Sequence, residues 1–350
     1  MIRRSVLQLA VVAAAGAMAA GTGHAQAVEL DAALRPYHVG APVEGRVSIA
    51  GNHATDDLVL AWANAFARLQ PGVQVDIRHD TRLTTDAFDV AVARDDIDLV
   101  PSARELVPSE TERLTRKLGG PPLVIPIATG SYATKSGTHA IAFYVNKDNP
   151  LARISIEQLR EIYAPDGRIS RWGQLGLSGE WADQPIHVFT VPISDPNGNP
   201  LGIVNYLTQR LLGGKPGWRR SIYQVDSNGP RIDQHMLHRI VREVAADRFA
   251  IGYSGFGFPE PGAKTLAIAE TAVGPWYVGT HAEVAARTYP LTRTIYFGVN
   301  ARQAGAVSPA VREFLRFVLS REGQAVMTTG TEKYLPLTAA AANEALAKLP

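Results

Sequence analysis

Short strand patterns and helical patterns alternate early in this chain, and this alternation limits the fold more than any other feature. Residues 46–50 alternate like a strand, and apolar side chains then recur at helical spacing over 58–69. A second strand is predicted over 73–78, a second helix over 87–93 and a short buried strand over 97–100. This order is typical of an α/β fold with mostly parallel strands.

The same two patterns continue through the rest of the chain. Strands are predicted over 123–128, 140–145, 186–191, 249–253 and 289–299. Helices are predicted from Ser155, over 201–212, over 235–244 and, as one amphipathic helix, over 309–327. A length of 350 residues indicates two domains of ordinary size.

Residues 1–27 are predicted to be a secretory signal peptide. Met1–Ser5 is basic, Val6–Ala20 is apolar, and Ala25-Gln-Ala27 has the small residues of a cleavage site. The apolar run is short and rich in alanine, which argues against a transmembrane anchor. The pair Arg3-Arg4 leaves both the Sec route and the twin-arginine route open. We therefore expect a periplasmic protein.

Charge and cysteine content exclude several kinds of partner. The formal net charge is +2, and removal of Arg3 and Arg4 with the signal brings it near zero. Without a basic stripe, nucleic acid and anionic membranes are poor partners. The chain has no cysteine, so it has neither disulfides nor a cysteine-linked lipid anchor. The sequence predicts no cofactor and no metal site.

Three turns of small polar residues carry the predicted binding site. Gly51–Thr55 and Pro101–Arg104 each follow a short strand, and Ile193–Pro200 opens directly into an apolar helical run. A helix start leaves backbone N–H groups without partners and carries a partial positive charge, so several starts aimed at one cleft bind a small anion. The predicted ligand-binding residues are Asn52, Thr55, Ser102, Arg104, Ser194, Asn197, Gly198 and Asn199. This pattern indicates capture of a solute rather than catalysis, so no catalytic residue is predicted.

Simpler structural roles remain open for several of these residues. Asn52 and Thr55 fit an ordinary N-cap of the next helix equally well. Arg104 also fits a surface ion pair with Glu105 or Glu110.

Four further groups of residues carry a resemblance to a known family. They are Val145-Asn-Lys-Asp-Asn-Pro-Leu151 with Ile156-Glu-Gln-Leu-Arg-Glu-Ile162, Trp172-Gly-Gln-Leu175, Ala250-Ile-Gly-Tyr253, and Tyr289-Pro-Leu291 with Phe314-Leu-Arg-Phe-Val-Leu-Ser-Arg-Glu-Gly-Gln324. In order and spacing the chain resembles the periplasmic phosphate-binding protein family, the solute receptors of phosphate ABC importers, from about Val47 to Leu337.

The resemblance implies a two-lobed periplasmic-binding-protein fold of type II, α/β in class. Each lobe is expected to hold a mostly parallel sheet flanked by helices, with two chain crossovers and a ligand cleft that closes by hinge motion. Lobe I is expected to comprise 28–137 and 288–350, and lobe II 138–287. The implied partners are a small anion such as phosphate and the membrane subunits of an ABC importer, and the protein is expected to be a monomer.

The ligand loop departs from the family pattern Arg-x-x-x-Ser-Gly-Thr. Ile193 stands in place of the Arg, Asn197 and Asn199 replace the Ser and Thr, and Gly198 is retained. Phosphate carries a charge of about −1.5 to −2 at neutral pH, and burying it without a bidentate arginine loses the strongest available contact. Asp195 would repel an anion if it faced the cleft. A weaker anion, a phosphorylated small molecule or a zwitterion therefore stays open as the ligand.

Two alternative functions belong to other classes. The first is a receptor-like sensor or protein-interaction module with a different small ligand or none. The second is a secreted serine hydrolase, because Gly252-Tyr-Ser254-Gly-Phe256 is similar to a nucleophile elbow, although Phe256 stands where a second glycine is needed.

Overall fold

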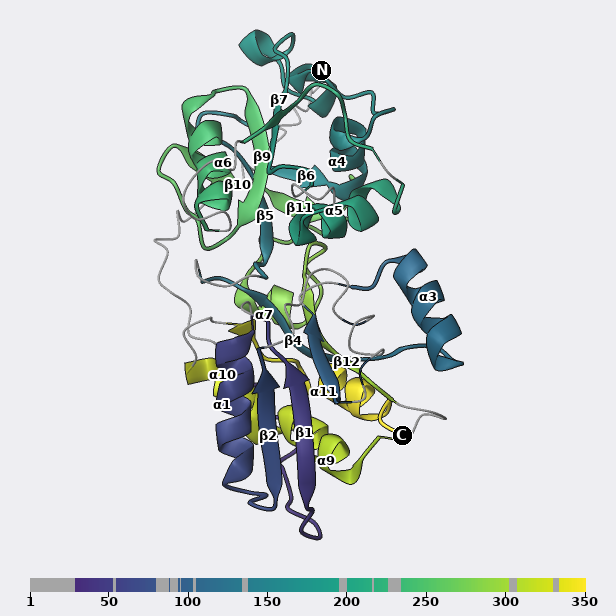
Figure 1. The fold of residues 1–350 in the computed structure, drawn as a ribbon. Helices are drawn as coiled ribbons and strands as arrows, with labels where there is room; N and C mark the ends of the chain where they lie inside the picture. The colour runs from purple at the N-terminus through teal and green to yellow at the C-terminus, as the bar shows by residue number, and fades with distance from the viewer. Residues whose placement is uncertain are drawn as a thin grey trace, which may run out of the picture.

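The computed structural model shows two α/β lobes, one above the other in Figure 1. The structure describes residues 29–52, 55–79, 88, 94, 96–102, 105–133, 138–194, 200–215, 217–225, 234–301, 307–329 and 334–350. The predicted signal peptide, 1–27, lies outside these residues, and so does most of the helix predicted over 87–93.

The sheet of lobe I has six strands in the order β13-β4-β12-β3-β1-β2. Their bounds are β1 Gly45–Ala50, β2 Val73–Arg78, β3 Leu99–Ser102, β4 Leu123–Ser131, β12 Thr294–Val299 and β13 Tyr334–Leu335. Strand β1 is parallel to β2 and β3. Strand β12 is antiparallel to both β3 and β4, and β13 is antiparallel to β4.

The sheet of lobe II has five strands in the order β10-β5-β9-β7-β8. Their bounds are β5 Ile141–Asn146, β7 His187–Thr190, β8 Ile222–Gln224, β9 Ala250–Gly255 and β10 Ala263–Thr265. Strand β7 is parallel to β8 and β9, whereas β5 is antiparallel to β9 and β10. Strands β6 (Arg153–Ser155) and β11 (Ala267–Ala269) form a separate parallel pair.

The two-lobed α/β fold and the two crossovers predicted from the sequence are confirmed. The chain passes from one sheet to the other between β4 and β5 and returns between β11 and β12. The prediction of mostly parallel sheets is wrong, because both sheets are mixed. In lobe I the reason is the return crossover, since β12 enters between β3 and β4 and runs against both of them.

The helices cover these sheets in both lobes (Figure 1). In lobe I they are α1 Asp56–Ala67, α3 Pro108–Leu118, α9 Pro309–Val318, α10 Arg321–Thr329 and α11 Ala339–Leu346. In lobe II they are α4 Ile156–Tyr163, α5 Gly202–Leu212 and α6 Gln234–Ala246, with 3-10 turns at Trp172–Leu175 and Gly179–Trp181. The short α7, His281–Ala285, precedes the return crossover. None of the helices in the described part of the chain has the length and apolar character that a bilayer span requires.

Two predicted elements are shorter than their sequence patterns suggested. The strand predicted over 289–299 begins only at Thr294, because Tyr289–Arg293 is the crossover itself and turns back through a 3.1 Å bond from Thr292 N–H to the Tyr289 carbonyl oxygen. The single helix predicted over 309–327 is two helices that break at Ser320. The Ser320 hydroxyl oxygen accepts the Gly323 N–H at 3.2 Å and thereby starts α10.

Aromatic side chains pack the helices of lobe I against its sheet. Phe66 of α1 contacts Phe314 of α9 edge-on at 5.3 Å, and Trp62 lies 6.1 Å from Phe297 of β12. In lobe II, Phe143 and Tyr163 pack in the same way at 5.6 Å. Each lobe therefore has a hydrophobic core of its own.

The edge of the lobe I sheet that faces lobe II carries two of the predicted ligand loops. The carboxyl ends of β1 and β2 point toward lobe II (Figure 1). Strand β3 is parallel to β1, so it ends at the same edge. The predicted loops follow β1 and β3 directly, and ligands of α/β proteins bind outside the carboxyl ends of their strands.

Candidate functional site

The two ligand loops predicted in lobe I are joined by a hydrogen bond. The side-chain amide of Asn52, after β1, donates to the carbonyl oxygen of Pro101 in β3 at 3.2 Å. Ser102 is the last residue of β3 and is only partly exposed. The structure therefore brings Asn52 and Ser102 close together at the ends of neighbouring strands. Arg104 lies outside the described residues.

Thr55 and Asp56 shape the first of these loops. Thr55 is the N-cap of α1 by position, yet its side chain makes no capping bond, and the hydroxyl donates to the Asn52 carbonyl oxygen at 3.4 Å. Thr55 is fully buried. The Asp56 carboxylate accepts the Asn52 N–H at 2.7 Å and complements the start of the helix. These contacts give Thr55 and Asp56 a structural role in the loop.

The predicted loop of lobe II is closed at its base and leads into α5. Ser194 pairs with Pro200 in an isolated antiparallel bridge. Asn197, Gly198 and Asn199 lie outside the described residues. Helix α5 begins at Gly202, and its N-cap residue, Leu201, has no side-chain acceptor for the first N–H groups. In Figure 1, α5 lies on the side of lobe II nearest to lobe I.

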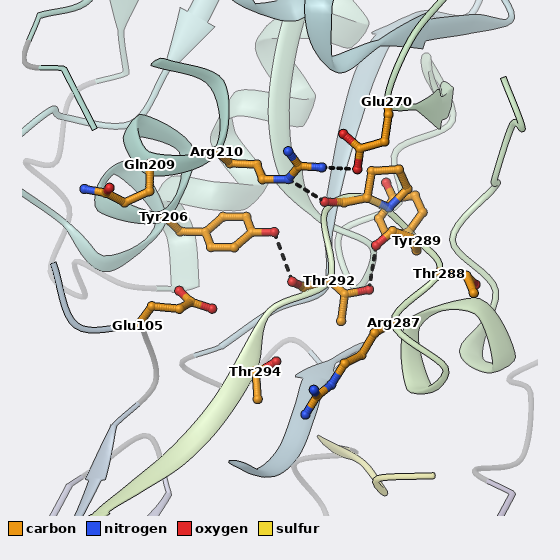
Figure 2. A pocket seen from close by; sticks show the side chains of 11 residues that line it. Glu105, Tyr206, Gln209, Arg210, Glu270, Arg287, Thr288, Tyr289, Thr292 and Thr294 are labelled. Atoms are coloured by element: carbon orange, nitrogen blue, oxygen red, sulfur yellow. Dashed lines mark hydrogen bonds and ion pairs between the residues drawn. The ribbon is translucent and has the colours of Figure 1, made fainter. Parts of the chain in front are cut away.

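A cavity of about 420 Å³ lies between α5 and the return crossover (Figure 2). Its lining residues are Glu105, Tyr206, Gln209, Arg210, Glu270, Arg287, Thr288, Tyr289, Pro290, Thr292 and Thr294. Of the predicted ligand-binding residues that the structure describes, Asn52, Thr55, Ser102 and Ser194 are not among its lining residues. The lining residues that come from α5 and from the return crossover make the cavity a feature of the hinge.

Polar side chains of α5 fasten this helix to the crossover, and Figure 2 shows the contacts. The Tyr206 hydroxyl donates to the Thr292 carbonyl oxygen at 3.0 Å. Arg210 donates through Nε to the Pro290 carbonyl oxygen at 2.9 Å and forms an ion pair with Glu270. Burial raises the pKa of Tyr206 well above its usual value, and the charge of Glu105 adds to this effect. The phenol is thus a neutral donor at physiological pH.

Sequence reasoning missed these hinge residues. The helical pattern of 201–212 was predicted, but nothing in it signals a partner some eighty residues later in the chain. The one available signal is the run of mostly polar residues from Asn205 to Arg210 between the apolar ends of the helix.

The chain matches a known family over most of its length. Residues 36–322 match the family model described as the PBP superfamily domain. The chain belongs to the PBP superfamily.

Known members resemble this PBP superfamily protein in sequence and in fold. The phosphate-binding protein PstS of Pseudomonas aeruginosa (strain PAO1) is 28% identical to it over 346 residues, which are 97% of this chain and 98% of that protein. The crystal structure of PstS from Borrelia burgdorferi matches with a TM-score of 0.58 and 18% identity over 84% of this chain and 100% of that chain. The crystal structure of an ABC-type phosphate transport receptor from Vibrio cholerae matches with a TM-score of 0.54 and 19% identity, over 83% of this chain and 100% of that chain.

Ile193, which replaces the arginine of the phosphate-binding loop pattern, is partly buried at the border of the lobe II core in this PBP superfamily protein. Its side chain packs against the buried hydrophobic cluster, and its N–H donates to the Gln224 side chain at 3.2 Å. A residue packed in this way offers no charge to a ligand.

Ser254, the nucleophile of the hydrolase alternative, is fully buried in β9. Its hydroxyl donates to the Leu237 carbonyl oxygen at 2.9 Å, so it cannot reach a substrate. Among the described residues, no group of three or more His, Cys, Asp or Glu side chains is arranged to hold a metal ion.

Proposed function

We propose that this protein is a periplasmic receptor that captures phosphate, or a related small oxyanion, and delivers it to an ABC importer. The observation that carries the proposal is the match to the PBP superfamily over 36–322, together with a 28% identical phosphate-binding relative that covers nearly the whole chain. A binding role without catalysis agrees with the burial of Ser254.

The geometry between the lobes supports an anionic ligand. Asn52 and Ser102 meet at the edge of the lobe I sheet, and the first turn of α5 starts on the side of lobe II nearest to that edge. Backbone N–H groups at a helix start bind anions, and amide and hydroxyl groups add neutral donors. We propose that Asn52, Ser102, Arg104, Ser194 and the 197–199 loop close on the ligand from both lobes. Thr55 contributes by holding the first loop in shape.

Calorimetric titration of the purified mature protein tests the ligand class. Inorganic phosphate, sulfate and a phosphonate are titrated at one pH and ionic strength, with chloride as the control anion. We expect saturable heat with phosphate at a stoichiometry of one. Native mass spectrometry of the protein as purified shows whether a ligand is carried along. Absence of binding to every oxyanion would contradict the proposal and favour the sensor or interaction module.

The remaining features of the proposal concern the whole molecule. We propose that lobe I comprises 28–137 and 288–350, that lobe II comprises 138–287, and that residues 1–27 are removed on export. The mature protein is proposed to act as a monomer that docks on importer membrane subunits. N-terminal sequencing of the periplasmic fraction and sedimentation of the purified protein test these points.

A further inference from the structure

A second cavity, of about 530 Å³, lies in lobe I away from the predicted ligand loops. Residues 35–38, α9 and the end of α11 enclose it. Gly45, the first residue of β1, lies against Ala310 in the first turn of α9, since a Cβ on Gly45 would be 3.3 Å from the Ala310 Cβ. The Asn52 loop follows the other end of β1. In Figure 1, α9 accordingly lies at the end of lobe I away from lobe II.

Arginine side chains give this cavity a positive charge. Arg35, Arg312 and Arg316 line it, and all three are exposed. Arg316 donates to the Glu313 carboxylate at 2.9 Å and is neutralised there. Within the described part of the chain, the guanidinium groups of Arg35 and Arg312 form no ion pair, and no acidic side chain is among the lining residues. Both cations are therefore available to a ligand.

The stability of α9 does not account for these arginines. Arg312 and Arg316 are four residues apart on one face of the helix, where like charges repel each other. Arg312 is also in the first turn of the helix, where the helix dipole disfavours a cation. An anion bound beside Arg312 would remove both penalties.

The rest of the cavity wall is apolar and firmly held. Leu346 and Leu349 line it and pack against the hydrophobic core of lobe I. The Tyr37 ring packs edge-on against Phe317 at 5.5 Å, and its hydroxyl donates to the Glu313 carboxylate at 2.7 Å. Ligand pockets of about 300–1,000 Å³ combine such an apolar wall with a few placed polar groups.

We propose that this cavity binds a small amphipathic carboxylate with an aliphatic body. The guanidinium groups of Arg35 and Arg312 bind the carboxylate, and Leu346 and Leu349 cover the aliphatic body. A carboxylate carries a single charge, so it is less costly to remove from water beside an apolar wall than phosphate, whose charge is about −1.5 to −2. The inference goes beyond the proposed function and does not rest on it.

Calorimetric titration of the mature protein with octanoate tests the proposal. Acetate is the matched probe, because it has the same carboxylate without the aliphatic body. We expect saturable binding of octanoate at a stoichiometry of one, and binding of acetate that is at least about 100-fold weaker. Inorganic phosphate should leave the affinity for octanoate unchanged, because the cavity lies away from the ligand loops.

Two substitutions in the cavity test which residues hold the carboxylate. Arg35→Gln together with Arg312→Gln should weaken octanoate binding by about 10-fold or more. Arg116→Gln is the matched control, because Arg116 is an exposed arginine of α3 in lobe I and does not line the cavity. It should change the affinity by less than about 2-fold. All three side chains are exposed, so the variants should melt close to the natural protein.

Absence of saturable octanoate binding would overturn the inference, and so would equal affinities of the double variant and the natural protein. Displacement of octanoate by inorganic phosphate would place octanoate at the ligand loops and would also overturn it. Acetate that binds as tightly as octanoate would leave the apolar wall without a role and would overturn the proposed ligand class. A natural protein that binds octanoate but no oxyanion would contradict the proposed function alone.

Discussion

The Tyr206 hydroxyl donates a 3.0 Å hydrogen bond to the carbonyl oxygen of Thr292, and this bond ties α5 of lobe II to the segment that returns to lobe I. A movement of α5 toward a ligand would therefore also displace the crossover segment. Allosteric and closing motions in proteins of two lobes depend on a few such hinge contacts.

Removal of this single bond should destabilise the protein measurably. Tyr206→Phe leaves the Thr292 carbonyl without this donor in a largely buried place, so we expect the free energy of unfolding to fall by about 1 kcal/mol. Urea unfolding followed by circular dichroism measures it. Tyr223→Phe is the matched control, because Tyr223 is 55% exposed and should change stability by less than about 0.3 kcal/mol. Equal losses in both variants would contradict the hinge role.

Replacing Arg210 should lower the stability of the protein more than replacing its ion-pair partner, Glu270. The Glu270 side chain is 59% exposed, and exposed ion pairs contribute about 0–1 kcal/mol, so Glu270→Gln should cost at most about 0.5 kcal/mol. Arg210→Gln also removes the donor to the buried Pro290 carbonyl and should cost about 1.5 kcal/mol. The urea midpoints of the two variants test this order of stability losses. Glu180→Gln is the control, because it removes the carboxylate of the exposed ion pair between Glu180 and Arg248. A reversed order would show that the ion pair dominates.

Gln324 should be one of the most sensitive positions in lobe I. This fully buried amide donates to the carbonyl oxygens of Ile127 and Val318, at 3.1 and 2.7 Å, and accepts the Leu337 N–H at 2.6 Å. Gln324→Ala leaves three buried backbone groups without partners, so we expect a loss of about 3 kcal/mol or more. Thermal unfolding measures it, and a loss below about 1 kcal/mol would mean that the backbone groups find other partners.

Stability should fall at alkaline pH because tyrosines are buried as neutral phenols. Burial and a hydrogen bond to Glu313 raise the pKa of Tyr37 to about 12, and burial with the charge of Glu105 raises the pKa of Tyr296 to about 12. An unfolded tyrosine ionises near pH 10, so this stabilisation is complete below pH 10 and is lost as the pH rises from 10 to 12. The urea midpoint should therefore fall over that range, and less steeply in Tyr37→Phe. A midpoint that stays constant up to pH 12 would contradict the prediction.

The asparagines of the second loop should contribute to affinity. Asn197→Ala together with Asn199→Ala removes two neutral donors, and we expect phosphate affinity to fall by one to two orders of magnitude, where each tenfold step is about 1.4 kcal/mol. Calorimetry measures the affinity, and thermal unfolding serves as the control for folding. Unchanged affinity would place the site elsewhere.

Several segments that carried the family resemblance are explained by packing. A Cβ on Gly252 would lie 2.7 Å from Ile240 of α6, so only glycine fits between this strand and its helix. Gln324 holds α10 against β4 and the segment after β13. Ser155 caps α4, as predicted, by accepting the Gln158 N–H at 3.1 Å. These residues identify the fold and say nothing of the ligand.

Helices that lack an apolar stripe were not predicted from the sequence. α3, Pro108–Leu118, is almost entirely polar, and only Leu114 and Glu110 are buried in it. The Glu110 carboxylate starts the helix by accepting the Val107 N–H at 2.9 Å. Periodicity of hydrophobic residues cannot detect such a helix, because its stability comes from caps and local charges.

The sequence by itself determined the α/β class, most element positions and the loops at the strand ends, because hydrophobic periodicity, caps and turn residues act over a few neighbouring residues. Only the tertiary structure decided the direction of β12, the contacts of α5 with the crossover and the position of Arg293 beside Gly202. These features join residues about 80 to 200 positions apart in the chain, and no local pattern encodes which distant segments meet.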